Sequence, residues 1–396
     1  MWSELLPLAA DLAWPFALAL AWVIGELGHR WTGLPRISLY GAVGFVLAHT
    51  QLGLLPPVTK GSVMLLANVA FGLILFEFGY RINLRWLRTN PWISATGVLE
   101  AAATFVAVYA VAITFGMPLL SSLLLASLAM STSPAAVMRV VNEERSSGQV
   151  TERLLHLTAI NCVLAVFAFK VIVGFWTFQT SGNIWQALSN SLVVLAVSAG
   201  LGATFGLGVP ALLRHFGRLT TDATLGFAIG VILLVAIAHS LKFSPVLAAL
   251  TFGFVARHRR VALNQTQRNF GALGDLLVVV LFVFVATTIE WQRVLTGFVL
   301  ALALISVRMA AKVFVVGALA RVSGVSWRKG VLTGFALTPI SVFVILLLEQ
   351  TRALGIDLVD QLAPLAAATL LLELVGPVIT QRALMLAGES AEPTGR

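Results

Sequence analysis

Two interrupted stretches decide the fold, LAMSTSP at residues 128–134 and ALTPIS at residues 336–341. Each lies inside a long apolar run and combines hydroxyl side chains with a proline. Proline removes a backbone donor and clashes with the preceding turn, so carbonyl groups one turn back lose their partners. Lipid offers no replacement, and such groups are tolerated only where they line a cavity or contact other protein. The two stretches therefore predict a pair of broken membrane helices.

The rest of the chain agrees with a membrane location. Of its 396 residues, 59% are hydrophobic and only 11% are charged, whereas a soluble domain carries about 25% charged residues. A helix needs roughly 20 apolar residues to cross the hydrocarbon core. We expect an all-α polytopic membrane protein with about 13 transmembrane helices. The candidate spans are residues 5–28, 36–50, 61–82, 92–115, 118–141, 151–178, 184–213, 220–241, 243–257, 272–289, 294–320, 328–350 and 361–382.

The charge distribution predicts the orientation. The chain has 26 Lys and Arg residues against 17 Asp and Glu residues, and basic residues gather in the cytoplasmic loops of membrane proteins. Most of the 26 fall on one side if the N-terminus is outside and the C-terminus is cytoplasmic. This fits a multi-pass protein of the inner cell membrane. It also explains the positive charge without a nucleic-acid partner.

Several function classes find no support in the sequence. The single cysteine, Cys162, excludes a disulfide framework and a cysteine-rich metal site. The chain carries no phosphate-binding glycine loop, metal-ligand cluster or nucleophile–base pair at readable spacing. We therefore expect a protein that is not an enzyme and that uses neither a cofactor nor a metal.

The two breaks fall in the fifth and twelfth spans of this series. An offset of seven spans reverses the direction in which the chain crosses the membrane. One kinked helix would be unremarkable, because proline is frequent in membrane helices. Two matching breaks in antiparallel spans indicate inverted repeats, a transporter architecture whose site lies near the bilayer midplane.

Ionisable residues at membrane depth are costly and are functional candidates by default. The deep acids and bases are Glu77, Glu100, Glu373, Lys170, Arg308 and Lys312. Each also has a structural interpretation. Glu77 stands four residues before Arg81 and can form an intrahelical pair, whereas Lys170 can extend its stem to the headgroups. Arg308 keeps its proton and must have a partner or water.

The sixth span carries a polar pair, Asn161 and Cys162, level with the two breaks. An amide in a membrane helix more often bonds a neighbouring helix than an ion. Beside two unwound segments, however, Asn161 becomes a candidate cation ligand. A lone buried thiol such as Cys162 ordinarily behaves as a small hydrophobe.

In their order, these motifs resemble the monovalent cation:proton antiporter superfamily, which has the sodium/hydrogen exchanger fold. The resemblance is carried by Pro35-Arg36 before a short span, LILFEFG at 73–79, STSPA at 131–135, TER at 151–153 leading to Asn161, and Thr338-Pro339. The family exchanges sodium, potassium or lithium for protons by moving a transport core against a scaffold. The resemblance implies that monovalent cations, protons and the lipid bilayer are the partners of this chain.

The resemblance also implies a division of the chain. A single transmembrane domain would cover residues 1–386, followed by a short cytoplasmic tail at 387–396. Residues of about 1–90 and 219–290 would form a scaffold that makes a homodimer. Residues of about 91–180 and 292–384 would form the transport core, joined to the scaffold through a linker helix at about 184–213.

The site implied by the resemblance lies where the broken helices cross. The family's Thr/Ser-rich break matches residues 131–133, its basic residue before the second break matches Arg308 best and Lys312 second, and an acidic residue of one branch matches Glu77. The predicted ion and proton site comprises Glu77, Ser131, Thr132, Ser133, Asn161, Cys162, Arg308, Lys312, Thr338 and Ser341, with Glu100, Lys170 and Glu373 as secondary candidates.

One departure from the family pattern matters most. The family usually has Asn-Asp or Asp-Asp in the sixth span, and the second carboxylate alternates between cation and proton. Here Cys162 occupies that position, and neutral sulfur is a poor ligand for hard cations, which prefer oxygen. Arg308 also loses its expected counter-charge. The first hypothesis is that Glu77 supplies the titratable oxygen, with Asn161 and the broken helices as neutral ligands.

Two alternatives stay open at the level of sequence. Arg308, Lys312 and the N-terminal ends of the half-helices could form an anion site, since helix N-termini attract negative charge. The chain could also be a non-transporting protein that keeps the fold for sensing or assembly.

Overall fold

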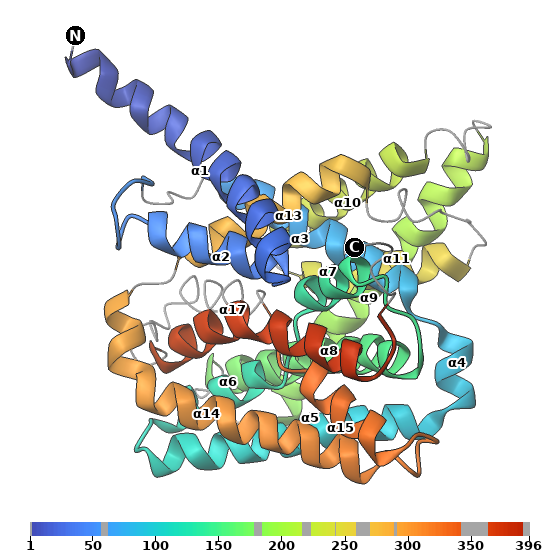
Figure 1. Ribbon diagram of the computed structural model, residues 1–396. Coiled ribbons are helices and arrows are strands. Elements are labelled where there is room, and N and C mark those ends of the chain that lie inside the picture. Colours follow the sequence, from blue (N-terminus) through green and yellow to red (C-terminus); the bar gives the residue numbers. More distant parts are fainter. Residues whose placement is uncertain are drawn as a thin grey trace.

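The computed structural model describes residues 2–56, 62–177, 184–215, 223–241, 243–258, 270–288, 291–341 and 363–390. Within these ranges the chain is built from helices and contains no strand. The predicted all-α membrane fold is therefore confirmed. Two groups of helices make up the molecule, and they occupy the upper and lower parts of Figure 1.

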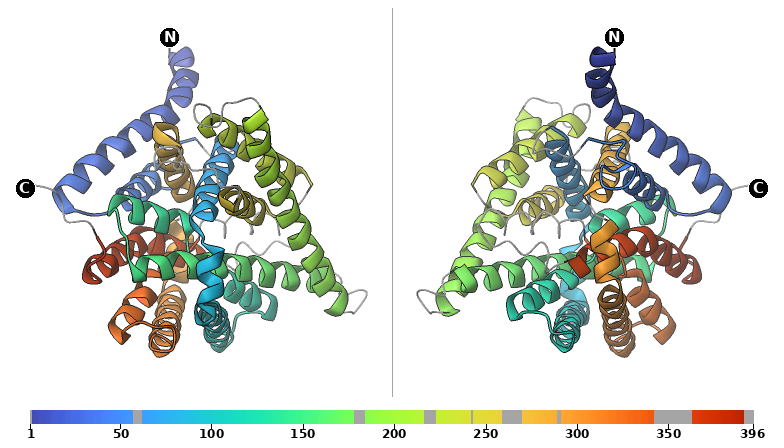
Figure 2. Two further views of the ribbon diagram at one scale, coloured as in Figure 1. Left: turned by 90° about the vertical axis from the view of Figure 1, so that its right-hand side faces the viewer. Right: turned by 90° about the vertical axis from the view of Figure 1, so that its left-hand side faces the viewer.

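The first group, called the scaffold group here, lies in the upper part of Figure 1. It comprises α1 (Trp2–Thr32), α2 (Arg36–Leu47), α3 (Ser62–Arg81), α10 (Ala223–Ser240), α11 (Pro245–His258) and α13 (Gly271–Thr287). In this group α3 packs against α11, α13 and α10, and α2 packs against α1 and α13. The N-terminal end of α1 projects beyond the rest of the group (Figures 1 and 2).

The second group, called the core group here, lies in the lower part of Figure 1. It comprises α5 (Pro91–Thr114), α6 (Leu119–Ala129), α7 (Pro134–Glu143), α8 (Gln149–Thr177), α14 (Trp291–Ala318), α15 (Trp327–Ala336) and α17 (Ala363–Leu386). Within it α14 packs against α5, α15 and α17, and α6 packs against α5 and α8. The short α4 (Leu84–Thr89) precedes α5, and the long α9 (Ile184–His215) packs against both α8 and α11.

Eight segments of the described ranges are long and apolar enough to cross a membrane, and one of them, Leu119–Glu143, comprises α6 and α7 together. Two further apolar helices, α2 and α13, are shorter. The expected number of about 13 spans stays a prediction, and residues 342–350 of the twelfth candidate span lie outside the described residues. The division into scaffold, core and linker also stays a prediction, although the packing separates two groups of helices.

The break in the fifth span has a clear local cause. The helix α6 ends at Ala129, and α7 begins with Pro134 at its first position, where the missing backbone donor costs no hydrogen bond. The side chain of Ser133 caps α7 by accepting a hydrogen bond from the Ala136 N–H at 3.2 Å. The broken fifth helix, predicted from the sequence, is thus confirmed.

The second break follows the same logic. Ser326 caps the start of α15 by accepting from the Lys329 N–H at 3.3 Å, and the helix ends at Ala336, three residues before Pro339. The chain then runs without helix from Leu337 to Ser341. The helix α15 therefore ends at the second break, and residues 342–362, which follow it, lie outside the described residues.

Candidate functional site

The two breaks meet inside the molecule. The backbone N–H of Ser133 donates to the carbonyl oxygen of Pro339 at 3.0 Å. The hydroxyl of Thr132 donates to the carbonyl oxygen of Leu337 at 3.3 Å. The two non-helical segments therefore satisfy part of each other's exposed backbone, as lipid-buried irregular chain requires. The crossing of the broken helices, predicted from the sequence, is confirmed.

Arg308 of α14 binds both broken helices at once. Its guanidinium donates to the carbonyl oxygens of Ala129 and Ser131, each at 2.8 Å, and to that of Thr338 at 2.6 Å. Ala129 ends α6, and Thr338 follows the end of α15, so two helix C-termini with negative partial charge face one arginine. These carbonyl dipoles solvate the positive charge of Arg308.

Lys312 lies one turn further along α14 and forms an ion pair with Glu100 of α5. Both side chains are completely buried. The Lys312 ammonium also donates to the carbonyl oxygen of Met130 at 3.2 Å and to the hydroxyl of Thr132 at 3.5 Å. Glu100 accepts a second hydrogen bond from the Thr104 hydroxyl at 3.1 Å. The secondary candidate Glu100 thus reaches the crossing through Lys312.

The sixth-span pair of Asn161 and Cys162 reaches the same threonine from α8. The Asn161 amide donates to the Thr132 hydroxyl at 3.3 Å, and the Cys162 thiol donates to the Thr132 carbonyl oxygen at 3.2 Å. Both side chains are buried. Thr132 therefore stands at the centre of a polar cluster to which α5, α8 and α14 all contribute.

Most of the predicted site residues gather at this crossing. The residues brought together are Ser131, Thr132, Ser133, Asn161, Cys162, Arg308, Lys312, Thr338 and Ser341, all of them buried. Among the described residues, two of the oxygens have no hydrogen-bond partner, Asn161 Oδ1 and Ser341 Oγ. Buried oxygens without a partner are rare in native proteins and call for an explanation.

Glu77 does not contact the crossing. It lies on α3, where its carboxylate accepts from Arg81 at 3.3 Å and from the Asn142 amide of α7 at 3.1 Å. The intrahelical pair with Arg81, one of the two interpretations of the sequence, is present. Glu77 also lines a small cavity between α3, α7 and α13 that reaches Ala135, next to the first break.

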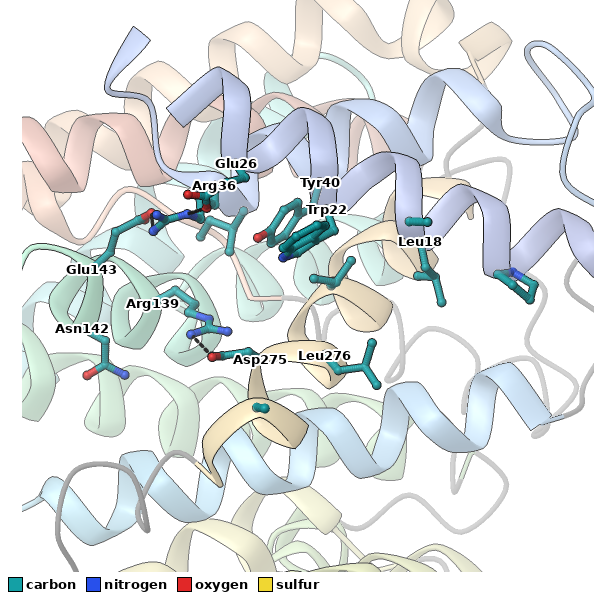
Figure 3. A pocket seen from close by; sticks show the side chains of 15 residues that line it. Leu18, Trp22, Glu26, Arg36, Tyr40, Arg139, Asn142, Glu143, Asp275 and Leu276 are labelled. Atoms are coloured by element: carbon teal, nitrogen blue, oxygen red, sulfur yellow. Dashed lines mark hydrogen bonds and ion pairs between the residues drawn. The ribbon is translucent and has the colours of Figure 1, made fainter. Parts of the chain in front are cut away.

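A larger cavity of about 850 Å³ opens between the scaffold and core groups. Figure 3 shows its labelled side chains, with Trp22 and Tyr40 on one wall and Arg139 of α7 on another. It shares Arg139, Asn142 and Asp275 with the small cavity that Glu77 lines, so the two cavities lie side by side along α7.

Ion pairs join α7 to the scaffold group beside this cavity. Arg139 contacts Asp275 of α13 at 2.7 Å, the pair joined by a dashed line in Figure 3. Glu143 contacts Arg36 of α2, also at 2.7 Å. These pairs are partly exposed, and such pairs contribute little to stability individually. Their place matters more, because they link half of a broken helix to the other group of helices.

The two remaining secondary candidates, Glu373 and Lys170, lie on α17 and α8. Glu373 of α17 is buried and packs beside Gly41 of α2. Its Oε1 atom has no hydrogen-bond partner within the described part of the chain. Lys170 lies near the far end of α8 and is half-buried. The Glu373 side chain therefore faces α2 of the scaffold group, although Gly376, one turn further along α17, approaches Pro339 at the second break.

Sequence reasoning missed Glu389, a residue of the predicted tail. Its carboxylate accepts from the N–H groups of Val150 at 2.9 Å and Thr151 at 2.8 Å, and so caps the start of α8. Burial tends to raise the pKa of Glu389, but these hydrogen bonds and the nearby Lys329 hold it below its usual value. No local signal in the sequence points to this contact, because Gly148 precedes α8 and Glu389 stands 239 residues from Val150.

In the described residues, no group of three or more His, Cys, Asp or Glu side chains is suited to a metal ion. What the crossing offers instead is a set of buried oxygens, one carboxylate and two fixed positive charges between two helix ends. This arrangement is typical of a membrane transporter for small ions, in which irregular backbone lines the site at the midplane.

Comparison with known proteins agrees with this class. The family model described as "Sodium/hydrogen exchanger, transmembrane" matches residues 16–386. The chain therefore belongs to the sodium/hydrogen exchanger family, which is a family of transporters and not of enzymes.

The individual proteins that the chain resembles share a quarter or less of its residues. The chain is 25% identical over 342 residues to the ammonium/H⁺ antiporter subunit AmhT of Alkalihalophilus pseudofirmus, which covers 83% of each protein. Two structures of the sodium proton antiporter MjNhaP1 of Methanocaldococcus jannaschii have the same fold. One has a TM-score of 0.72 at 18% identity and covers 95% of this chain and 98% of the other. The second, at pH 8, has a TM-score of 0.65 at 16% identity and covers 96% of both.

Proposed function

We propose that the protein exchanges a monovalent cation, sodium or potassium, for protons across a membrane by alternating access. The observation that carries the proposal is the crossing itself. Two helix C-termini, Asn161 and the Glu100–Lys312 pair meet at Thr132 without exposure to the surface. Ionisable groups at this depth are costly, and they are retained in membrane proteins mainly along ion and proton pathways.

The ligand chemistry favours a cation. Alkali ions bind hard oxygen donors, and the crossing offers amide, hydroxyl and carboxylate oxygens. The positive groups that an anion would need are already engaged, because Arg308 holds backbone carbonyls and Lys312 holds Glu100. For this reason the anion alternative receives no support from the contacts, and we do not propose it.

The route to the crossing follows α7 in this proposal. The large cavity beside Arg139 and the small cavity beside Glu77 lie in sequence toward Ala135, one residue beyond the first break's proline. Glu77 would attract a cation on its way to the site. Movement of the core group would break the Arg139–Asp275 and Arg36–Glu143 pairs and close this route.

Proteoliposomes with a pH-sensitive dye test the proposal. A proton gradient is imposed, and sodium, potassium and lithium are added in turn. The proposal requires that at least one of them dissipates the gradient in a protein-dependent way. Ammonium is tested separately by uptake of labelled methylammonium, because ammonia crosses membranes unaided. A folded protein that changes no gradient with any of these ions would favour a non-transporting role.

The orientation and assembly are part of the same proposal. We infer an N-terminus outside and a cytoplasmic C-terminus, from the distribution of basic residues, and a homodimer formed by the scaffold group. Large apolar side chains on α1, among them Phe16 and Trp22, are exposed, and we infer that lipid or a second copy of this chain covers them. Terminal reporter fusions test the orientation, and native mass spectrometry tests the dimer.

A further inference from the structure

The family acid of the sixth span is absent from this chain, and Cys162 stands in its place. The thiol donates to the Thr132 carbonyl oxygen at 3.2 Å and is buried. It acts as a packing and hydrogen-bonding group there. A proton-coupled exchanger still needs a carboxylate within reach of the crossing, because the neutral ligands cannot exchange a proton for a cation near neutral pH.

Among the residues that the structure describes, Glu100 is the carboxylate that is hydrogen-bonded to a side chain of the crossing. It lies on α5, two spans before Cys162, and its side chain is fully buried against Lys312. An ion pair in this setting must overcome a desolvation cost of several kcal/mol per charge. Two apolar side chains could fill the same space without that cost. The pair is therefore more than a packing device.

Only one of the two oxygens of the Glu100 carboxylate is hydrogen-bonded within the described residues. The hydrogen bonds from Lys312 and from Thr104 both go to Oε1. Among the described residues Oε2 has no partner, although it is buried. Asn161 repeats this pattern from the other side, since its amide nitrogen is bonded to Thr132 while its oxygen is unpartnered.

These two oxygens belong to one cluster. Lys312 joins Glu100 to the Thr132 hydroxyl at 3.5 Å, and Asn161 donates to the same hydroxyl at 3.3 Å. A cation that displaces the Lys312 ammonium would meet a carboxylate oxygen, an amide oxygen and a hydroxyl. Lys312 itself is held by the Met130 carbonyl oxygen at 3.2 Å, so it has a place to remain when it leaves Glu100.

We propose that the acid of this exchanger has moved from the sixth span to the fourth, so that Glu100, paired with Lys312, binds the cation and the exchanged proton in turn. This inference rests on the proposed function. The ion pair is the state in which Glu100 holds neither the cation nor the exchanged proton. When a cation binds at Oε2, the protonated Glu100 carboxyl gives its proton to water while the Lys312 ammonium keeps its own, and one proton returns to Glu100 when the cation leaves. The charge of the cluster is the same in both states.

The first test uses purified protein in detergent with a pH dye. Addition of the transported cation to the wild type releases protons. Glu100→Gln alone leaves Lys312 buried without its partner and risks misfolding, so the main variant is Glu100→Gln/Lys312→Gln, which removes both charges together. We expect this variant to elute as a folded protein and to lose the cation-induced proton release.

The matched control is Glu152→Gln, which removes a half-exposed carboxylate from α8 and should release protons as the wild type does. Proton release that persists in the folded double variant overturns the inference. It leaves the proposed function intact if proteoliposomes of the wild type still exchange cations. Loss of exchange in the wild type itself contradicts the proposed function and not this inference alone.

A second measurement needs no variant. Dicyclohexylcarbodiimide reacts with protonated carboxyl groups in membrane segments, and mass spectrometry locates the modified residue. We expect labelling of Glu100 that falls when the transported cation is present. Labelling of Glu77 without Glu100, or labelling of Glu100 that the cation does not reduce, contradicts the assignment even if the double variant fails to fold.

Discussion

The backbone N–H of Ser133 donates to the carbonyl oxygen of Pro339 at 3.0 Å. This single bond joins two segments that stand about 200 residues apart in the sequence. It fixes the crossing at which Arg308, Lys312, Asn161 and Thr132 meet. Together with the hydrogen bond from the Thr132 hydroxyl to the Leu337 carbonyl oxygen, it satisfies part of the backbone that the two prolines leave without helical partners.

Arg308 should be the main support of this crossing. In Arg308→Gln, the carbonyl oxygens of Ala129, Ser131 and Thr338 lose a charged donor, and each such bond is worth about 1.5–3 kcal/mol. We expect a loss of at least about 3 kcal/mol in stability, read as a lower melting temperature in detergent. Arg321→Gln, at an exposed position, is the control. Equal melting of the two variants would contradict this role.

A variant of Glu77 tests whether this carboxylate attracts the cation on its way to the site or itself binds the exchanged proton. Because its carboxylate lines the small cavity beside α7 and contacts Arg81 and Asn142, Glu77→Gln should raise the cation KM several-fold and leave exchange measurable at saturating cation. Exchange is followed with the pH dye in proteoliposomes over a range of cation concentrations. Complete loss at every concentration would return the titrating role to Glu77, as the sequence alone suggested.

Substitutions of Cys162 test whether the sixth span needs a hydrogen-bond donor or a carboxylate at this position. A hydroxyl can replace the thiol as donor to Thr132, so Cys162→Ser should keep exchange and change stability by no more than about 1 kcal/mol. An ionised aspartate has no proton for that bond and brings a second carboxylate near Lys312. Cys162→Asp should therefore retain cation exchange with a shifted pH profile. Radiolabelled anion uptake that appears in the wild type and disappears in Cys162→Asp would revive the anion alternative.

The pairs beside the large cavity offer a test of alternating access. In a Cys162→Ser background, Arg139→Cys and Asp275→Cys place two thiols where α7 faces α13 at an ion-pair contact of 2.7 Å. A reversible thiol-specific crosslinker should stop exchange by tying the core group to the scaffold group, and a reductant should restore it. The single-cysteine variants treated in the same way are the controls. Full exchange in the crosslinked double variant would contradict movement at this boundary.

Glu389, which lies outside the membrane-spanning helices, should make a pH-dependent contribution to the stability of the fold. Its pKa is lowered in the folded protein by hydrogen bonds from α8, so the carboxylate stabilises the fold above its ordinary pKa and loses this contribution as the pH falls through the lowered value. Glu389→Gln should melt at a lower temperature than the wild type at pH 7. The difference should shrink below about pH 4. A difference that is the same at both pH values would argue against an ionised cap.

The broken helices and the depth of Arg308 could be predicted from the sequence because the bilayer restricts what a chain may bury. A proline among hydroxyl residues inside an apolar run has few physical solutions. The contacts of the charged groups could not be predicted in the same way. Glu100 and Lys312 lie on α5 and α14, and nothing in their local sequences pairs them. That pairing depends on how the two halves of the core group pack.

Other features escaped sequence reasoning for related reasons. The carbonyl oxygens that accept hydrogen bonds from Arg308 belong to the backbone, which leaves no residue type to recognise. Glu389 resembled an ordinary tail carboxylate, because the helix that it caps begins far away in the chain. The sequence assigned Glu77 to the ion site because the residue lies deep in the third candidate span. In the structure it contacts Asn142 of α7 and lines the small cavity beside that helix.

The most direct test of the central claim is cation-driven proton movement in proteoliposomes, measured with a pH dye for the wild type beside Glu100→Gln/Lys312→Gln. We expect that sodium or potassium collapses an imposed proton gradient through the wild type and fails to do so through the folded double variant. Equal collapse through both proteins, or none through the wild type, would contradict it.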